Sequence, residues 1–177
     1  MNLKKIYQTL DDRDNADYIE ANGPFRCERN DAWIGKGFYF WEDNIEWAHK
    51  WGKKCYGNRY VICQSSYDLD VKNYLDLADA KCNEEIFSLK EKLQKRRNTK
   101  DVKLAHIIAY LQESKDFKCD AIRLVFQKID DTIEVSQQYN AYLPRIISIQ
   151  ICVLKKSFLI DRFEIIHPSE YIAGCLV

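Results

Sequence analysis

The stretch that decides the fold reads Asp31-Ala32-Trp33-Ile34-Gly35-Lys36-Gly37-Phe38-Tyr39-Phe40-Trp41-Glu42. Two glycines, one residue apart, lead into four consecutive aromatic residues. Aromatic side chains favour a pleated, half-buried surface, so the aromatic run is predicted to form a strand. Phe38 and Phe40 would point to one face of it, and Tyr39 and Trp41 to the other. The pattern fits a core strand entered through a tight turn, and equally a backbone that a ligand approaches closely at Gly37.

A helix is expected directly after this strand. Asp43 or Asn44 can cap it, and Ile45, Ala48 and His49 then recur at helical spacing. Strands and helices also alternate along the rest of the chain. The further strands are expected at Leu3–Thr9, Arg59–Gln64, Cys119–Phe126, Ile146–Leu154 and Ser157–Ile166, and the helices at Asp14–Asn22, Asn44–Lys53, Asp79–Arg97 and Val102–Glu113. This mixture predicts an α+β fold.

The second half of the chain carries four further expectations. The last two strands are expected to pair as a hairpin over Lys155-Lys156, and residues 133–144 are expected to form an irregular loop. Asp101 is expected to cap the helix that follows it. In the strand at Ile146–Leu154, alternation places Ser148, Gln150 and Cys152 on one face and the isoleucines on the other.

Length and composition indicate a single domain over residues 1–177. Such a chain can bury roughly 70% of its unfolded surface. Lysine and arginine together number 27, as do aspartate and glutamate, so the net charge is zero. A zero balance argues against a broad polyanion-binding surface and leaves room for a local basic patch.

The seven cysteines contain no Cys-x-x-Cys pair and no metal-ligand spacing, so neither a disulfide framework nor a metal site is expected. The three histidines, His49, His106 and His167, also lack acidic or cysteine neighbours at ligand spacing. We find no signal peptide and no apolar run approaching the roughly 20 residues of a membrane span. Reduced thiols and a cytoplasmic location follow most simply.

The segment Gly35-Lys36-Gly37-Phe38-Tyr39-Phe40, followed by a helix, resembles the Gly-Lys-Gly-Ile-Tyr-Phe segment of poly(ADP-ribose) polymerases and their diphtheria-toxin-like relatives. It is also similar to a group of mostly uncharacterised bacterial proteins in which Arg-Asn precedes Trp-Leu-Gly-x-Gly-Ile-Tyr-Phe-Trp-Glu. Arg29-Asn30 and Gln150-Ile151-Cys152-Val153 match two further parts of that group's pattern. The resemblance implies an ADP-ribosyltransferase-like fold: a split, mostly antiparallel sheet with flanking helices.

The resemblance also implies a site. Tyr39 takes the place of the tyrosine in the His-Tyr-Glu triad of these transferases, while Gln8 stands at the histidine and Gln150 at the glutamate. NAD would be the substrate, cleaved or only bound. The residues that the resemblance places against NAD are Thr9, Arg29, Asn30, Gly37, Tyr39 and Trp51. Considered without the resemblance, Gln8 is an ordinary polar residue at a strand end and Arg29 belongs to a solvated loop.

The missing glutamate leaves two functions open. A carboxylate about 5 Å from an oxocarbenium-like centre contributes about 3 kcal/mol at an effective dielectric of about 20, or roughly two orders of magnitude in rate. Gln150 keeps a hydrogen bond and lacks that charge. The chain is then either a mono-ADP-ribosyltransferase, for instance a toxin or defence effector acting on a protein, nucleic acid or small molecule, or an inactive module that binds NAD or ADP-ribose.

A basic run from Lys90 to Lys100 suggests a third functional hypothesis, nucleic-acid binding. Such a run is usually a solvated helix end, and the alternative is a nucleic-acid-binding patch. The sequence leaves both readings open.

Overall fold

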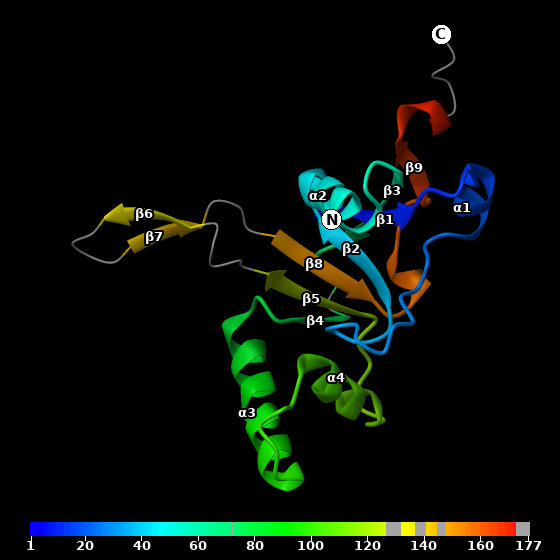
Figure 1. The fold of residues 1–177 in the computed structure, drawn as a ribbon. Helices are drawn as coiled ribbons and strands as arrows, with labels where there is room; N and C mark the ends of the chain where they lie inside the picture. Colours follow the sequence, from blue (N-terminus) through cyan, green and yellow to red (C-terminus); the bar gives the residue numbers. More distant parts are fainter. Residues whose placement is uncertain (72, 127–131, 137–140, 145–147, 173–177) are drawn as a thin grey trace.

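The computed structural model describes residues 1–71, 73–126, 132–136, 141–144 and 148–172 (Figure 1). Its strands are β1 (Leu3–Asp11), β2 (Phe38–Glu42), β3 (Tyr60–Asp68), β4 (Tyr74–Asp76), β5 (Ala121–Phe126), β6 (Thr132–Ser136), β7 (Ala141–Pro144), β8 (Ser148–Val153) and β9 (Glu164–His167). Its α-helices are α1 (Ala16–Asn22), α2 (Ile45–Tyr56), α3 (Ala80–Arg97) and α4 (Leu104–Gln112). Short 3₁₀ turns follow at Lys156–Phe158 and Ser169–Tyr171.

Seven strands form one open sheet in the order β4-β5-β8-β2-β1-β3-β9, and every neighbouring pair is antiparallel except β4 and β5. The expected α+β class with a mostly antiparallel sheet is therefore confirmed. The expected split into two halves is not seen as two separate sheets. Between β1 and β2 the described ladder is short, however, with the two pairs Ile6–Glu42 and Tyr7–Trp41. We call this short ladder the seam.

The register assigns each side chain to one of two faces, because directly opposed residues share a face. One face, here the Phe40 face, carries the larger core. Its fully buried strand residues are Ile6, Phe40, Val61, Cys63, Tyr67, Ala121, Ile151 and Val153. Ile19 of α1 and Phe158 of the first 3₁₀ turn pack on it. These apolar side chains lie between the sheet and α1, and their burial is the main force that holds this layer.

The opposite face, here the Tyr39 face, is covered by two helices that pack over different strands (Figure 1). Ala48 of α2 packs with Tyr7 and Ile62 from β1 and β3. Ile108 of α4 packs with Leu124 of β5 and with other residues of the β4, β5 and β8 region. The Tyr39 face of β2 lies between these two packed clusters.

Local sequence fixes where α2 and α3 begin. The Asn44 side chain accepts a hydrogen bond from the Glu46 amide, and the Asp79 side chain accepts one from the Cys82 amide. Both are N-caps that satisfy an otherwise free helix donor. The C-terminus of α3 is set by Asn98, which adopts the left-handed conformation at φ 46°. Leu93 of α3 is buried against Val102 and Ile107, which fixes α3 on α4.

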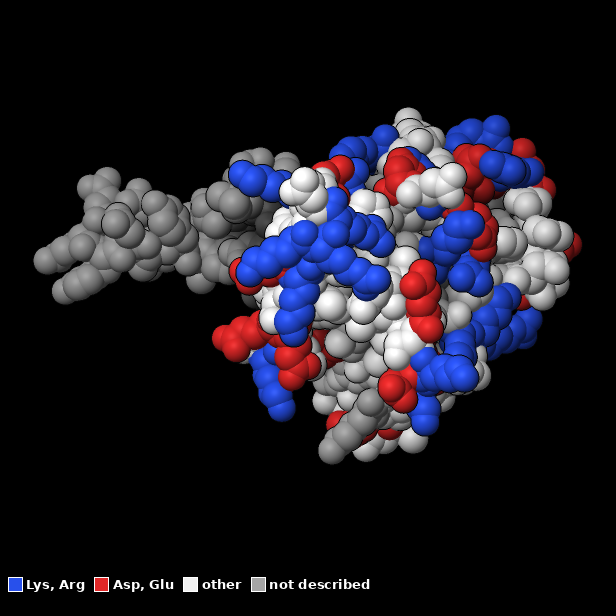
Figure 2. Space-filling view, turned by 90° about the horizontal axis from the view of Figure 1, so that it is seen from below, with Lys and Arg blue, Asp and Glu red and all other residues white. Residues whose placement is uncertain are grey.

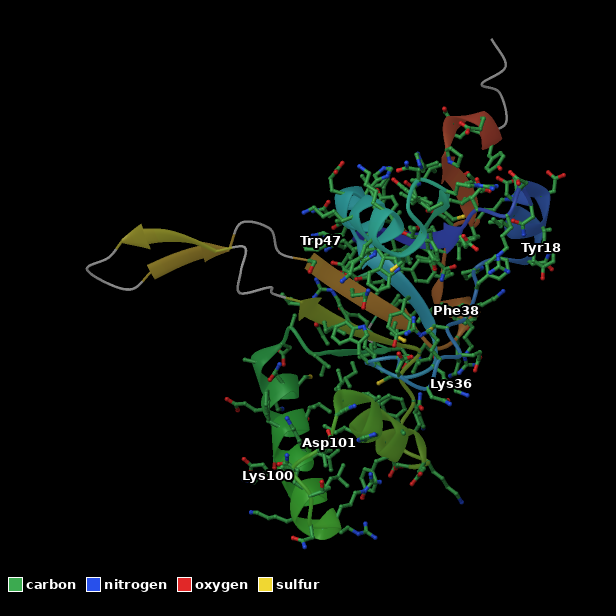
Figure 3. All side chains as sticks on the ribbon, viewed as in Figure 1. Tyr18, Lys36, Phe38, Trp47, Lys100 and Asp101 are labelled. Carbon is green, nitrogen blue, oxygen red and sulfur yellow. The ribbon has the colours of Figure 1, made fainter. Side chains whose placement is uncertain are left out.

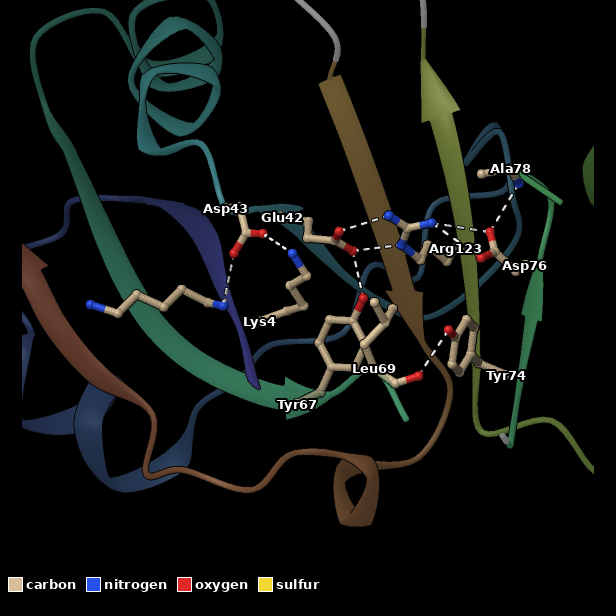
Figure 4. Close-up of polar contacts among 10 residues, drawn as sticks. Lys4, Glu42, Asp43, Tyr67, Leu69, Tyr74, Asp76, Ala78 and Arg123 are labelled. Atoms are coloured by element: carbon tan, nitrogen blue, oxygen red, sulfur yellow. Dashed lines mark hydrogen bonds and ion pairs between the residues drawn. The ribbon is translucent and has the colours of Figure 1, made fainter. Parts of the chain in front are cut away.

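A buried ionic cluster joins β2 to β5 on the Phe40 face (Figure 4). The Arg123 guanidinium donates to both carboxylate oxygens of Glu42 at 2.8 Å, and it also donates to Asp76 at 3.1 Å. Tyr67 adds a hydroxyl hydrogen bond of 2.5 Å to the same Glu42 carboxylate. The Glu42 side chain is 1% exposed and that of Arg123 is 12% exposed. Hydrogen bonding to Glu42 raises the pKa of Arg123, so the guanidinium stays charged.

Three expectations about local structure were wrong. Residues 157–166 do not pair with β8: after the turn at Lys156–Phe158, β9 pairs with β3. The reason is that both edges of β8 are already occupied, by β2 and β5. The expected irregular loop contains most of β6 and all of β7, which pair as antiparallel strands, and residues 137–140 of it lie outside the described part.

The third error concerns the start of α4. Asp101 does not cap this helix, which begins at Leu104 after Lys103. Val102 is 4% exposed because it packs in the cluster with Leu93 and Ile107, and this burial holds residues 101–103 outside the helix. No helix in the described ranges combines the length and apolar character needed to cross a membrane.

Candidate functional site

Two of the three expected triad residues lie on one face of the sheet. In the β2–β8 ladder Tyr39 is opposite Cys152 and Trp41 is opposite Gln150, so Tyr39 and Gln150 both belong to the Tyr39 face. Gln8 belongs to the Phe40 face, because its neighbour Tyr7 pairs with Trp41. The structure thus brings Tyr39 and Gln150 to one side and places Gln8 on the other.

Both ends of the Gln8 side-chain amide are hydrogen-bonded within the fold. Its Nε2 donates to the Phe25 carbonyl at 2.8 Å, and its Oε1 accepts from the Phe25 amide at 2.9 Å. The side chain is 5% exposed. A buried amide that is satisfied on both ends is costly to detach, so Gln8 fastens the segment after α1 to β1 at the open end of the seam.

Tyr39 is held by the turn that precedes β2. Its hydroxyl donates to the Gly35 carbonyl at 2.7 Å and accepts from the Ile34 amide at 3.2 Å. Gly35 has φ 115°, a backbone conformation that side chains rarely adopt, so glycine is needed for this turn. Burial raises the pKa of the Tyr39 hydroxyl above its ordinary value. Tyr39 therefore remains neutral near pH 7 and offers a half-buried ring, not a base.

Gln150 contacts a residue that the sequence did not single out. Trp33 Nε1 donates to Gln150 Oε1 at 2.9 Å, although the two residues are 117 positions apart. Gln150 is 8% exposed and lies between β2 and β5, whereas Trp33 is 39% exposed. This hydrogen bond joins the turn before β2 to β8 and gives the site one exposed indole ring.

Two more indoles come from α2 and pack on Trp41. The Trp47 ring stacks on Trp41 with centroids 5.6 Å apart, and the Trp51 ring lies tilted at 6.3 Å (Trp47 is labelled in Figure 3). Lys50 Nζ is 4.5 Å from the Trp47 ring centroid. Trp51 is 41% exposed. We name the set Trp33, Trp41, Trp47 and Trp51 the tryptophan cluster. Trp33 belongs to it through its hydrogen bond to Gln150, which is opposite Trp41 in the β2–β8 ladder. The set contains all four tryptophans of the chain.

The sequence carried a signal for this cluster. Trp47 and Trp51 are four residues apart on a helix, so they share a face, and Trp41 shares a strand face with Tyr39. Of the four, only Trp51 was placed against NAD by the resemblance. Trp33 could not be found in this way, because its contact with Gln150 depends on the pairing of β2 with β8.

The backbone groups of Gly37 and the side-chain hydroxyl of Thr9 are hydrogen-bonded within the chain. The Gly37 carbonyl accepts from the Cys27 amide at 2.8 Å, and the Gly37 amide donates to the Cys27 carbonyl at 3.3 Å. A Cβ at Gly37 would collide with Cys152 Sγ and would lie 3.0 Å from the Val153 carbonyl oxygen. The Thr9 hydroxyl donates to the Ala48 carbonyl at 2.9 Å. Close packing of the chain itself therefore accounts for the glycine.

Arg29 and Asn30 lie in the exposed loop before β2. Arg29 forms an ion pair with Asp31, with Nη2 at 2.6 Å from the carboxylate, and both side chains are largely exposed. The hydrogen bond to Asp31 raises the pKa of Arg29, and the same bond lowers the pKa of Asp31. Exposed pairs of this kind exchange partners readily, so Arg29 can still bind a phosphate.

Cys152, next to Gln150 on β8, does not supply a nucleophile. Burial raises the pKa of its thiol to about 12, so the reactive thiolate is scarce near pH 7. Glu42, which follows Trp41, faces the other side and is bound to Arg123. Among the described residues, no group of three or more histidines, cysteines and acids could hold a metal ion.

His49 and His167 lie together, which the sequence did not indicate. Their ring centroids are 4.8 Å apart, and His49 Nδ1 is 2.9 Å from the Tyr60 hydroxyl. A hollow of about 660 Å³ beside them is lined by Asp12, Asp14, Asn58, Arg59, Tyr60, Ile166, His167, Pro168, Ser169, Glu170 and Tyr171. The β3–β9 pairing creates this contact. Burial and then the neighbouring His49 lower the pKa of His167.

Comparison of the chain with protein-family models, with curated proteins and with solved structures gives no match.

Proposed function

We propose that this protein is an ADP-ribosyltransferase-like domain that binds NAD or ADP-ribose on the Tyr39 face. The observation that carries the proposal is the tryptophan cluster beside Tyr39 and Gln150. Indole rings provide flat apolar surfaces on which an adenine or nicotinamide ring can stack. Lys50 beside Trp47 and Arg29 in the adjoining loop provide cations for the phosphates.

The fit to the nicotinamide amide differs between two backbone positions. In the resembled family the backbone at the Thr9 position reads that amide. Asn2 bonds Leu69 and Asp12 bonds Arg59, so the alternation of the β1–β3 ladder directs the Thr9 backbone groups away from β3 and toward β2. The backbone of Gly37, in contrast, is bonded to Cys27. Ring stacking, the nearby cations and the direction of the Thr9 backbone groups therefore support the proposal, and the Gly37 backbone does not.

A second candidate function is slow mono-ADP-ribosyl transfer from NAD. The observation in its favour is that Tyr39 and Gln150 share one face, as two of the three residues of the resembled triad would. The roughly hundredfold loss of rate that we expect from the absent carboxylate makes this the weaker candidate. Release of nicotinamide from NAD separates it from binding alone.

Intrinsic fluorescence is the most direct test, since every tryptophan of the chain belongs to the cluster. Titration with NAD and with ADP-ribose should quench the emission saturably, and calorimetry should give the same Kd. Trp51→Ala should weaken binding at least about fivefold, the lower end of what one base–aromatic stack is worth. The matched control is Tyr18→Ala, because Tyr18 is an exposed aromatic of α1, away from the cluster. Absence of both heat and quenching at millimolar ligand would refute the proposal.

A further inference from the structure

The C-terminal half of α3 and the residues after it carry a concentration of positive charge. Between positions 90 and 103 there are seven cations and two acids, a net charge of +5, whereas the whole chain is neutral. The remaining residues therefore carry −5. Figure 2, which views the molecule from below, shows Lys and Arg gathered on this side. The asymmetry favours a polyanion here and disfavours one elsewhere.

Helical geometry places part of this charge around an exposed aromatic ring. At about 100° per residue, Lys90, Lys95 and Arg97 lie within about 80° of Phe87 around the axis of α3. Leu93, which packs on α4, lies about 120° away. Phe87 is 59% exposed, and Lys90 Nζ is 5.9 Å from its ring centroid.

The segment after the helix adds Lys100 to the same side. Gln94, which is close to Phe87 in direction around the axis, donates from Nε2 to the Lys100 carbonyl at 2.8 Å. Figure 3 labels Lys100 beside the lower half of α3. We call the set Phe87, Lys90, Lys95, Arg97 and Lys100 the basic face.

The cations of the basic face are not needed to hold the fold. Within the described ranges, none of them forms a salt bridge with an acid. Lys95, Arg97 and Lys100 are exposed, and the apolar contacts of the region are made by Leu93, Val102 and Ile107. The partial negative charge at the C-terminus of α3, about half a unit, offsets only a small part of this positive charge.

We propose that the basic face binds single-stranded nucleic acid, with its cations on the phosphates and Phe87 stacked on a base. A positively charged strip beside an exposed ring is the arrangement that such binding uses. A membrane surface fits less well, because it would need an apolar helix face, and Ile86, Leu89 and Leu93 are packed against α4. The inference is independent of NAD binding.

Fluorescence anisotropy with labelled 20-nucleotide single strands of mixed sequence, RNA and DNA, tests the proposal on the full chain. With four phosphate contacts, the affinity should fall about fiftyfold between about 50 mM and about 200 mM salt. Lys95→Gln/Arg97→Gln/Lys100→Gln should weaken binding at least tenfold and flatten the salt dependence. The matched control, Lys81→Gln/Lys115→Gln/Lys118→Gln, removes the same charge from exposed positions outside the basic face and should bind nearly as the wild type does.

Two single substitutions test the roles of Phe87 and Glu91 in binding. Phe87→Ala should weaken binding about tenfold without changing the salt slope, because it removes stacking and no charge. Glu91 lies within about 40° of Phe87, so Glu91→Gln should strengthen binding. The proposal is overturned if the strands do not bind at about 50 mM salt, or if both triple variants bind equally. Tighter binding of a matched duplex also overturns it, as does binding of phosphatidylserine vesicles in place of the strands.

Discussion

Trp33 Nε1 donates a hydrogen bond to Gln150 Oε1 at 2.9 Å, and the two residues are 117 positions apart in the chain. The contact joins the turn that precedes β2 to the strand that follows the β6–β7 pair. It therefore positions an exposed indole beside Gln150 of β8.

Removing the donor should destabilise the fold modestly. Trp33→Phe keeps a ring and leaves the Gln150 oxygen, on a side chain that is 8% exposed, without this partner. We expect a loss of about 1 kcal/mol in unfolding free energy, which lowers Tm by about 2–4 °C in a chain of this size. Differential scanning fluorimetry measures the shift. Trp51→Phe is the control and should change Tm by less; equal shifts would remove the hydrogen bond as the cause.

Gln150→Glu tests whether slow transfer chemistry is present. If the second candidate function holds, the added carboxylate should raise the rate of nicotinamide release from NAD by up to about a hundredfold. The rate is measured by chromatography of nicotinamide. Cys152→Ala, on the same strand face, serves as a control without added charge. Rates that stay at the level of uncatalysed hydrolysis in all three proteins would leave binding as the function.

Replacing Glu42 alone should lower the free energy of unfolding more than replacing Glu42 and Arg123 together. Glu42→Gln leaves the Arg123 charge largely buried, and we expect a loss of about 3–5 kcal/mol in unfolding free energy. Replacing both residues, as Glu42→Leu with Arg123→Met, should recover much of this loss, because both buried charges are removed together and only the partly exposed Asp76 loses its partner. Urea denaturation measures both. A double variant that is no more stable than Glu42→Gln would contradict this account.

Gly37 should not tolerate a side chain. Gly37→Ala places a Cβ against Cys152 Sγ and 3.0 Å from the Val153 carbonyl oxygen, so we expect a loss of about 1–3 kcal/mol. Adding Cys152→Ala removes the sulfur and should restore part of the stability. The comparison needs four proteins in a double-mutant cycle by urea denaturation, and purely additive effects would show that the sulfur is not the obstacle.

Stability should fall in mild acid because of His167. Burial is the largest cause that lowers the folded pKa of His167, and the charges of His49 and Lys53 lower it further. Glu170 opposes this shift. Below its ordinary pKa of 6.5 the unfolded chain binds the proton more readily, so acidification through that value favours unfolding. His167→Phe should reduce the drop in the urea midpoint between about pH 7.5 and about pH 5.5. An unchanged drop would assign the effect to other groups.

Local patterns predicted the elements that depend on neighbours in the sequence. The aromatic strand appears as Phe38–Glu42, and the helix predicted from Asp79 to Arg97 appears as Ala80–Arg97 with Asp79 as its cap. These features depend on alternation, helical spacing and a capping side chain, all of which are visible in a short window.

Features that depend on strand pairing could not be read in this way. The sequence does not show that β9 pairs with β3 and not with β8, and this pairing brings His49 beside His167. It also does not show which face Gln8 occupies relative to Tyr39, since that depends on the register of β1 against β2. For the same reason the Trp33–Gln150 contact could be seen only in three dimensions.

The seam divides the sheet into a group of four strands, β4, β5, β8 and β2, and a group of three, β1, β3 and β9. The chain passes from one group to the other four times, and the smaller group begins at residue 3 and is completed only at residue 167. Neither group is a continuous piece of polypeptide. During synthesis on a ribosome, β1 is made first and β9 almost last. The group of strands that contains β1 therefore cannot be completed until nearly the whole chain has been synthesised. A chain stopped before residue 164 leaves one edge of β3 uncovered, and β3 is fully buried along much of its length.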